Sequence, residues 1–376
     1  MRTIILGAGL AAVGAGSAFA GGIDRSGQGV SQIFEKGSYV ELGFSTSHPS
    51  VSGKDVAAFG GQPSGNVAGD FTQLSLAYKA DINDRLSYAI IIDQPFGADL
   101  NYAPTSIALG GTKVSADATS ATGVLRYKFD DNWSVYGGVR ADKASGDITL
   151  KGLAYGPFSG YRVQLSDDVG YGYLVGAAYE RPDIALRVAL TYNSAIKHKF
   201  DTLETLGGAP IGNKPTDVST PQSVNLDFQT GIAENTLLFG QVRWADWSAF
   251  DIDPITFTTM ANGGKFVKGG GLIDLQDTTT WTVGLGRKFN DTWSGAVSVS
   301  YEKKGDPLVS PLAPTNGRVG MTLAAVYTQD NLKITTGVNY TKLGDAQPET
   351  GTPDVARANF TGNSALGVGV RVGFSF

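Results

Sequence analysis

A period of two in the hydrophobic pattern is the feature that most limits how this chain can fold. It is clearest in the final segment, where Leu366, Val368 and Val370 alternate with Gly and Arg and the pattern runs on to Phe376. Successive side chains of a β-strand point to opposite faces, so one face here is apolar and the other is small or polar. Sustained helical spacing is almost absent. The pattern therefore predicts an all-β protein.

The same alternation recurs along the chain and predicts about fourteen strands in total. The other segments that show it are residues 40–44, 74–78, 86–92, 125–129, 135–139, 171–179, 184–192, 224–228, 238–244, 281–285, 297–301, 321–327 and 332–340.

The connections between these segments alternate in length. Six are tight turns rich in Asp and Asn, and the seven between them are long loops that contain Gly and Pro. Short turns on one side and long loops on the other are typical of an even-stranded transmembrane antiparallel β-barrel. The predicted tight turns are residues 81–85, 130–132, 181–183, 233–235, 290–292 and 330–331.

Two further patterns favour a membrane barrel over a soluble all-β protein such as a pair of sandwiches or a propeller. Aromatic residues flank the tight turns, as Trp133 and Trp293 do, which predicts an aromatic girdle at a membrane interface. The faces opposite the apolar ones mix Gly, Ser, Thr and Asn with scattered charges, as a lumen would. An open sheet edge in hydrocarbon would leave backbone groups unpaired, so the first and last strands must pair.

Residues 1–20 have the three parts of a cleaved signal peptide. Arg2 is followed by an apolar stretch at residues 4–13 and by small residues that end at Ala20. That stretch is too short for a membrane-spanning helix, which needs roughly 20 residues. We therefore expect export to the bacterial outer membrane, where the C-terminal Phe376 is an ending that the barrel-assembly machinery recognises.

Composition excludes several functions. The net charge of -5 argues against a nucleic-acid partner, and the absence of cysteine means that the exported chain folds without disulfides. His48 and His198 are its two histidines, and it has no Gly-x-Ser-x-Gly elbow or zinc-binding helix motif. We expect no enzyme activity, no cofactor and no metal. A barrel lipase would need a serine and a histidine in contact.

The third predicted strand is interrupted. The apolar run at residues 86–92 is followed by Asp93, Gln94, Pro95, Phe96 and Gly97, and proline cannot donate a hydrogen bond to a strand ladder. Such a break inside a closed wall leaves a bulge or a gap beside the next strand. The alternative is that the strand ends at Asp93 and its outer loop begins there.

Apolar residues outside the predicted strands indicate two more features. In residues 21–36, Ile23, Val30, Ile33 and Phe34 are spaced as in a short helix, which favours a plug, or hatch, folded back into the lumen over a disordered leader. Long loops also carry apolar side chains that solvent does not require. They form either a ligand-capture surface or a packed cover over the barrel mouth, and the candidates are Leu153, Tyr155, Phe158, Phe257 and Phe266.

Several stretches together resemble the FadL/TodX family of outer-membrane transporters. They are residues 186–192 running into Ile196 and Lys197, residues 242–250, Tyr301 and Glu302 leading to Asp306 and Pro307, and the turn at residues 131–134. The resemblance covers most of the sequence after residue 20. Residues 21–36 are shorter than the family's usual hatch and lack its Asn-Pro-Ala.

The resemblance implies a fourteen-stranded barrel, residues 37–376, plugged by a hatch and opened sideways at a kink in the third strand. It implies passive uptake of long-chain fatty acids, with aromatic or other hydrocarbons as the alternative, released laterally into outer-membrane lipid by a monomer. A general polar porin would instead need an unplugged lumen. Residues that hold a ligand carboxylate in the family correspond to Arg140, Lys143, Lys265 and Lys268.

Overall fold

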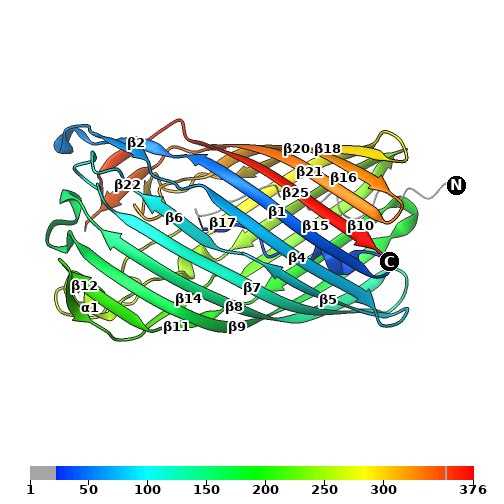
Figure 1. Cartoon of the computed structure of the whole chain (residues 1–376), viewed down its shortest axis with the longest axis horizontal. Coiled ribbons are helices and arrows are strands. Elements are labelled where there is room, and N and C mark those ends of the chain that lie inside the picture. Colours follow the sequence, from blue (N-terminus) through cyan, green and yellow to red (C-terminus); the bar gives the residue numbers. More distant parts are fainter. Residues whose placement is uncertain (1–22, 352–353) are drawn as a thin grey trace.

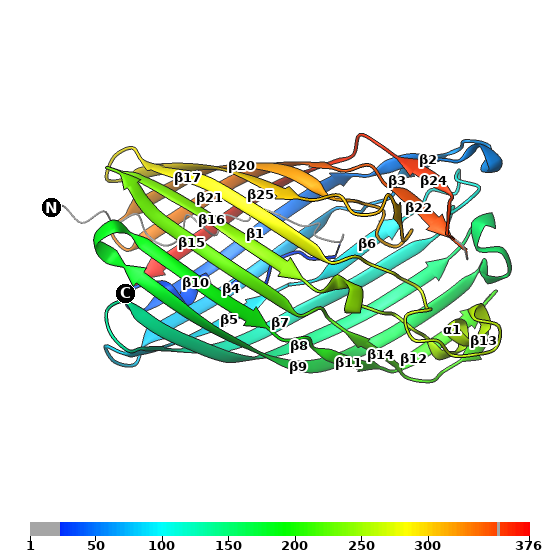
Figure 2. The same cartoon turned by 180° about the vertical axis from the view of Figure 1, so that it is seen from behind.

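The computed structural model describes residues 23–351 and 354–376, and fourteen antiparallel strands form its wall. The first strand pairs with the last, from Tyr39 opposite Ser375 to Ser50 opposite Ser364, so the sheet closes into a barrel (Figure 1, Figure 2). Closure confirms the predicted barrel and rules out separate sandwiches. The wall strands are β1 (Tyr39–Ser50), β4 (Phe71–Asp81), β5 (Leu86–Asp93) continued by β6 (Gly97–Asn101), β7 (Lys113–Lys128), β8 (Trp133–Leu150), β9 (Tyr161–Arg181), β10 (Leu186–Asn193), β15 (Ser223–Ala233), β16 (Thr236–Ala245), β17 (Thr278–Lys288), β18 (Trp293–Glu302), β20 (Arg318–Gln329), β21 (Leu332–Leu343) and β25 (Ser364–Ser375).

Tight turns join the strands at the end of the barrel that holds the C-terminus (Figure 1). They form where predicted because Asp and Asn side chains accept hydrogen bonds from the backbone two and three residues ahead. Asn290 accepts those of Thr292 and Trp293 at 2.9 and 2.8 Å. At the equivalent turn, the N–H groups of Trp133 and Asn132 lower the pKa of Asp130. One turn contains a 3₁₀ helix, η5 (Pro182–Ile184).

The long connections at the other end hold short elements that the sequence pattern did not predict. Two small sheets, one of β2, β3 and β24 and one of β19, β22 and β23, form there, β11 pairs with β14, and β12 and β13 extend the wall beside β9. The elements are β2 (Ser52–Asp55), η3 (Ala57–Phe59), β3 (Pro63–Asn66), η4 (Leu153–Phe158), β11 (Lys197–Phe200), β12 (Thr202–Leu206), β13 (Ala209–Gly212), β14 (Thr216–Ser219), η6 (Trp247–Ala249), α1 (Ile255–Ala261), β19 (Leu308–Val309), β22 (Gln347–Thr350), β23 (Val355–Ala356) and β24 (Ala358–Phe360).

The wall is apolar on its outer face and largely polar on its inner face, which is the reverse of a soluble barrel. Apolar side chains that alternate along each strand point outward and stay exposed, as with Leu42 at 56% and Leu125 at 55%. The residues between them point inward, and buried lumen positions include Arg126 and Arg243. An apolar outer surface on a closed sheet matches the hydrocarbon layer of a membrane. Among the described residues, no helix has the length and hydropathy of a membrane span.

Aromatic rings gather on the outer face near the tight turns. Trp133 packs on Tyr179 with ring centroids 4.7 Å apart, and Trp293 packs on Tyr327 at 5.1 Å. Phe376 at the C-terminus lies 6.4 Å from Tyr78. Tyr and Trp suit the interface between hydrocarbon and water because their apolar rings carry a polar O–H or N–H group.

The stability of the last long loop should depend on pH because of Glu349 on β22. Burial, with Asp354 and Asp274 nearby, raises its pKa to about 7. A raised carboxyl pKa means that the folded loop binds the proton more tightly, so its stability is greatest in acid and falls as pH rises towards and through 7. We expect faster hydrogen exchange at residues 347–350 in the wild type than in Glu349→Gln at pH 8.5. At about pH 4, below the ordinary carboxyl pKa of 4.5, the two should match, and an equal ratio at both pH values would contradict the assignment.

Candidate functional site

The third wall strand is broken at residues 94–96, between β5 and β6. Against β7, Asp93 lies opposite Ser120, whereas Gly97 lies opposite Asp117. Three residues of the broken strand therefore face two residues of β7, which is a one-residue bulge. Pro95 sits inside the bulge, where its missing N–H leaves no ladder position empty. The strand resumes as β6 beyond the break and does not end at Asp93.

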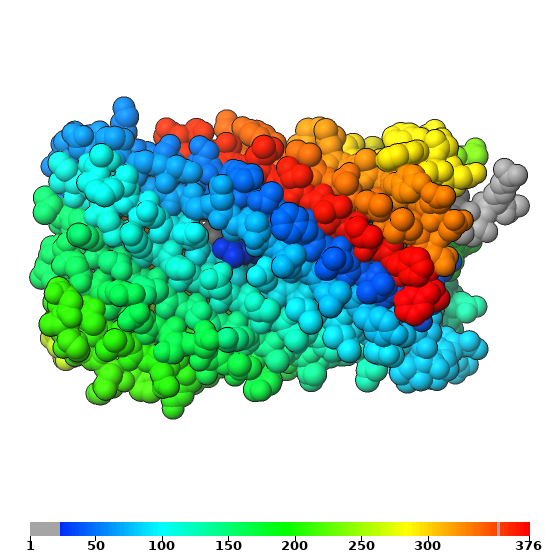
Figure 3. All heavy atoms as spheres, viewed as in Figure 1, coloured from blue at the N-terminus to red at the C-terminus, as the bar shows by residue number. Residues whose placement is uncertain are grey.

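On its other side the break leaves a gap in the wall beside β4. The ladder between β4 and β5 runs only from Leu76 to Asp81, so residues 71–75 of β4 have no partner in β5. Gln94 reaches across, and its Oε1 accepts the N–H of Leu74 at 3.0 Å. Figure 3 shows dark-blue atoms of the N-terminal segment through an opening between the light-blue and cyan strands.

The N-terminal segment, residues 23–36, meets the broken strand from inside the barrel. Asp24 forms a β-bridge with Phe96, the N–H of Arg25 donates to the carbonyl of Pro95 at 2.8 Å, and that of Gly97 donates to Ile23 at 3.0 Å. Backbone groups of the broken strand that do not pair with β4 therefore form hydrogen bonds with this segment. The predicted export signal, residues 1–20, and the first two residues of the predicted hatch lie outside the described residues.

Arg25 fills the inner side of the gap. Its guanidinium carbon lies 4.5 Å from the centre of the Phe71 ring, and a nitrogen lies 3.6 Å from a carboxylate oxygen of Asp117. A Cβ atom at Gly97 would stand 2.3 Å from that guanidinium carbon. Gly97 therefore leaves the room that Arg25 occupies, and any side chain there would push Arg25 away.

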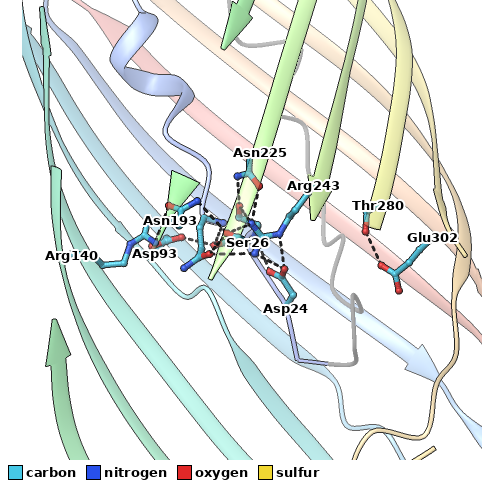
Figure 4. Close-up of polar contacts among 12 residues, drawn as sticks. Asp24, Ser26, Asp93, Arg140, Asn193, Asn225, Arg243, Thr280 and Glu302 are labelled. Atoms are coloured by element: carbon cyan, nitrogen blue, oxygen red, sulfur yellow. Dashed lines mark hydrogen bonds and ion pairs between the residues drawn. The ribbon is translucent and has the colours of Figure 1, made fainter. Parts of the chain in front are cut away.

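Arg243 of β16 holds the segment to the opposite wall (Figure 4). It pairs with the Asp24 carboxylate at 2.8 Å and donates to the carbonyl of Gly27 at 3.0 Å. Its Nη1 also donates to Asn225 at 2.9 Å, and Ser26 is hydrogen-bonded to Asp93 at the end of β5. Guanidinium groups suit such sites because their five donors lie in a fixed plane. This network ties the segment to two sides of the lumen.

The second half of the segment ends in a short 3₁₀ helix, η2 (Ser31–Phe34), and is the apolar part of the plug. The Phe34 ring lies between Arg126 and Arg187, 4.5 and 4.7 Å from their guanidinium carbons. Ile33 and Val30 are buried in the same cluster. Of the predicted hatch residues, Ile23 lies apart from these three and packs against the larger apolar cluster under the loops.

Two cavities lie beside the break, one on each side. An apolar cavity of about 90 Å³ lies on the loop side and is lined by Phe96 of the break, Ile23 of the segment and Trp247 of η6. Its lining includes Asp117 and His198 but no Lys or Arg among the described residues. A polar cavity of about 260 Å³ lies between the segment and the wall from β16 round to β4, and it reaches the gap at Leu74 and Gln94.

The four predicted carboxylate-binding residues are not brought together. Arg140 points into the lumen, where it donates to Thr122 at 2.9 Å and Asn193 at 3.3 Å. Lys143 points outward from the same strand and pairs with Asp167 at 2.6 Å. Lys265 and Lys268 are exposed in the loop after α1, and neither lines the two cavities.

The predicted ligand-capture residues divide into two groups. Phe257 of α1 is buried and packs on Phe158 at 5.0 Å, and Tyr155 and Phe158 pack against the apolar cluster over the barrel mouth. Leu153 and Phe266 are 69% and 51% exposed. The packed residues Phe257, Tyr155 and Phe158 form part of a cover over the mouth, whereas Leu153 and Phe266 expose apolar surface on the outside.

A family model described as outer membrane protein transport protein (OMPP1/FadL/TodX) matches residues 31–376. The chain belongs to this family. FadL/TodX membership places it among outer-membrane transporters of hydrophobic compounds and not among enzymes. No curated protein matches the chain by sequence.

Solved structures of the FadL/TodX type share its fold. A Pseudomonas aeruginosa FadL homologue is 16% identical with a TM-score of 0.70 over 92% of both chains. The P. putida toluene transporter TodX is 16% identical with a TM-score of 0.64, covering 91% of this chain and 90% of its own. The Ralstonia pickettii toluene transporter TbuX is 12% identical with a TM-score of 0.62 over 91% and 90%.

Sequence reasoning missed the polar residues that hold the segment: Asp24, Arg25, Ser26 and Arg243. A signal existed for Arg243, because it stands between Val242 and Trp244 at an inward position of a predicted strand. A charge at membrane depth needs a partner, so an inward arginine indicates a contact inside the lumen. The identity of that partner could not be inferred from spacing.

Proposed function

We propose that this FadL/TodX-family protein carries long-chain fatty acids, or similar hydrophobic molecules, passively across the outer membrane and releases them sideways. A ligand caught by the exposed apolar loop residues enters the apolar cavity and leaves through the gap between β4 and β6. The observation that carries this proposal is that Phe96 and Gly97 of the broken strand line the apolar cavity while Gln94 lines the gap. Binding and partition into lipid supply the free energy.

Aromatic or other uncharged hydrocarbons are the second candidate. The apolar cavity has no Lys or Arg in its described lining, so it offers an alkyl chain or a ring a fit but gives a carboxylate no counter-charge. Two of the similar structures are toluene transporters. A general polar porin is disfavoured because residues 23–36 cross the lumen.

Five accompanying features remain part of the proposal. Residues 1–20 are removed on export, and Phe376, which is 64% exposed, is available to the barrel-assembly machinery. The protein works as a monomer, with Arg140 as the candidate among the four predicted cations that faces the lumen. Lateral release places the ligand in outer-membrane lipid, so the ligand does not have to enter water on the inner side of the membrane.

Filling the apolar cavity tests the proposed path. Ala144 of β8 lines this cavity, and Ala144→Trp should lower the uptake of radiolabelled oleate by cells by about tenfold, because an indole occupies the space that an alkyl chain needs. Ala141→Trp, three residues along the same strand and outside the cavity lining, is the matched control. Equal uptake by both variants at equal barrel levels would refute the path.

A further inference from the structure

The polar cavity contains one guanidinium that stands apart from the rest. Arg371 of β25 lines it and makes no hydrogen bond or ion pair with any residue in the described part of the chain. The other arginines in its lining each have a polar partner: Arg25 with Asp117, Arg187 with Gln229, Arg243 with Asp24 and Arg318 with Glu302. An ionised side chain at membrane depth without a partner indicates a functional site.

The side chain of Arg371 lies over a glycine next to the gap. Gly43 of β1 is opposite Arg371 on one side and opposite Ser75 of β4 on the other. A Cβ atom at Gly43 would be 3.5 Å from Cγ of Arg371 and 2.3 Å from Oγ of Ser75. Ser75 is the last β4 residue before the ladder with β5 begins, so the backbone of Arg371 lies two strands, roughly 10 Å, from the β4 edge of the gap, and its side chain extends over Gly43 between them.

The carboxylate on the nearest inward position does not neutralise this charge. Glu41 lies two residues before Gly43 on β1 and is opposite Gly373. Its oxygens accept hydrogen bonds from the Tyr39 hydroxyl at 2.8 Å and from Nε2 of Gln32 at 3.1 Å, and it forms no ion pair with Arg371. The Arg371 guanidinium therefore keeps its donors for a molecule that enters the cavity.

We propose that Arg371 binds the carboxylate headgroup of an amphipathic molecule at the inner mouth of the gap, while the hydrocarbon tail passes between β4 and β6 into lipid. A carboxylate fits a guanidinium through two parallel hydrogen bonds. Hydroxyls of Ser45, Ser75 and Thr335 line the same cavity and can donate to its remaining lone pairs. This inference rests on the proposed lateral release, and it makes the acid, not the uncharged hydrocarbon, the ligand that the exit recognises.

Matched probes test the site. The full barrel in phosphatidylcholine nanodiscs is titrated with radiolabelled laurate and with radiolabelled dodecanol, which differ only in the headgroup. Arg371→Gln should weaken laurate binding by about tenfold or more, because a charge-assisted hydrogen bond contributes that much, and should leave dodecanol binding within about twofold. Arg371→Lys should fall between, since lysine keeps the charge but loses the planar fork.

Arg287→Gln is the control, because Arg287 donates to Thr236 on the exposed side near a tight turn. Laurate binding that is unchanged in Arg371→Gln, or laurate and dodecanol binding weakened equally, would overturn the proposed site. Laurate uptake separates this outcome from failure of the proposed function. If Arg371→Gln weakens laurate binding but laurate is not taken up through the gap, lateral release is refuted and the Arg371 site stands. If laurate uptake is normal and Arg371→Gln has no effect on binding, the Arg371 site is refuted and lateral release stands.

Discussion

Deletion of Pro95 is expected to close the gap in the wall and to reduce uptake of hydrophobic ligand by at least about tenfold. The registers of β5 and β6 against β7 differ by one residue, so removing one residue from the bulge brings both into the same register. Asp93 would remain inward and Gln94 outward, and β6 would keep its present faces. The joined strand could then extend its ladder along residues 71–75 of β4, where the gap now lies.

Pro95→Ala is the matched control because it keeps the extra residue and the carbonyl that accepts the Arg25 N–H. Uptake of radiolabelled oleate by cells should stay near wild type in this variant and fall in the deletion. Equal amounts of folded barrel must be present, which heat-dependent gel mobility shows. Undiminished uptake by a folded deletion variant would exclude lateral release through this gap.

Arg243→Ala is expected to detach the N-terminal segment and open the lumen to ions. The change leaves the buried Asp24 carboxylate without its counter-charge, and breaking a buried pair in this way costs about 3–5 kcal/mol. It also removes donors to Gly27 and Gln28 of the segment. We expect steady conductance steps in planar bilayers from this variant and no steps from the wild type.

Two companion variants make this result specific. Arg243→Lys should conduct intermittently, because an ammonium can pair with Asp24 but cannot bind Gly27 and Asn225 at the same time. Arg287→Ala, outside the lumen, should stay closed. A closed Arg243→Ala barrel would mean that Phe34 and its two arginine neighbours hold the plug without Arg243.

Much of the wall could be predicted from the sequence because its signals are local. A strand alternates its faces every residue, so the apolar positions of residues 366–376 are enough to say which side chains face lipid. The signals for tight turns are also local, since the side chain of Asn290 accepts hydrogen bonds from the backbone N–H groups two and three residues ahead. Barrel closure followed from the cost of unpaired backbone groups in hydrocarbon.

The candidate site was predictable only where one strand carried the signal. Pro95 marked the interruption because its missing N–H is a property of the residue itself. The loop elements were not predicted, since α1 spans only Ile255–Ala261 and is too short to show a period. Of the predicted cations, Lys143 faces outward, an orientation that depends on the register of β8 against β9.

The hydrophobic pattern by itself determined the alternating wall, its turns and the place of the break, because each depends on neighbours within a few residues. The residues that close the break are set by contacts between distant parts of the chain. Asp24 and Arg243 are 219 positions apart, and Arg371 faces Gly43 only because the last strand returns to the first. Closing the barrel fixes which inward charges meet and leaves Arg371 without a hydrogen-bond or ion-pair partner among the described residues, and no local pattern contains that information.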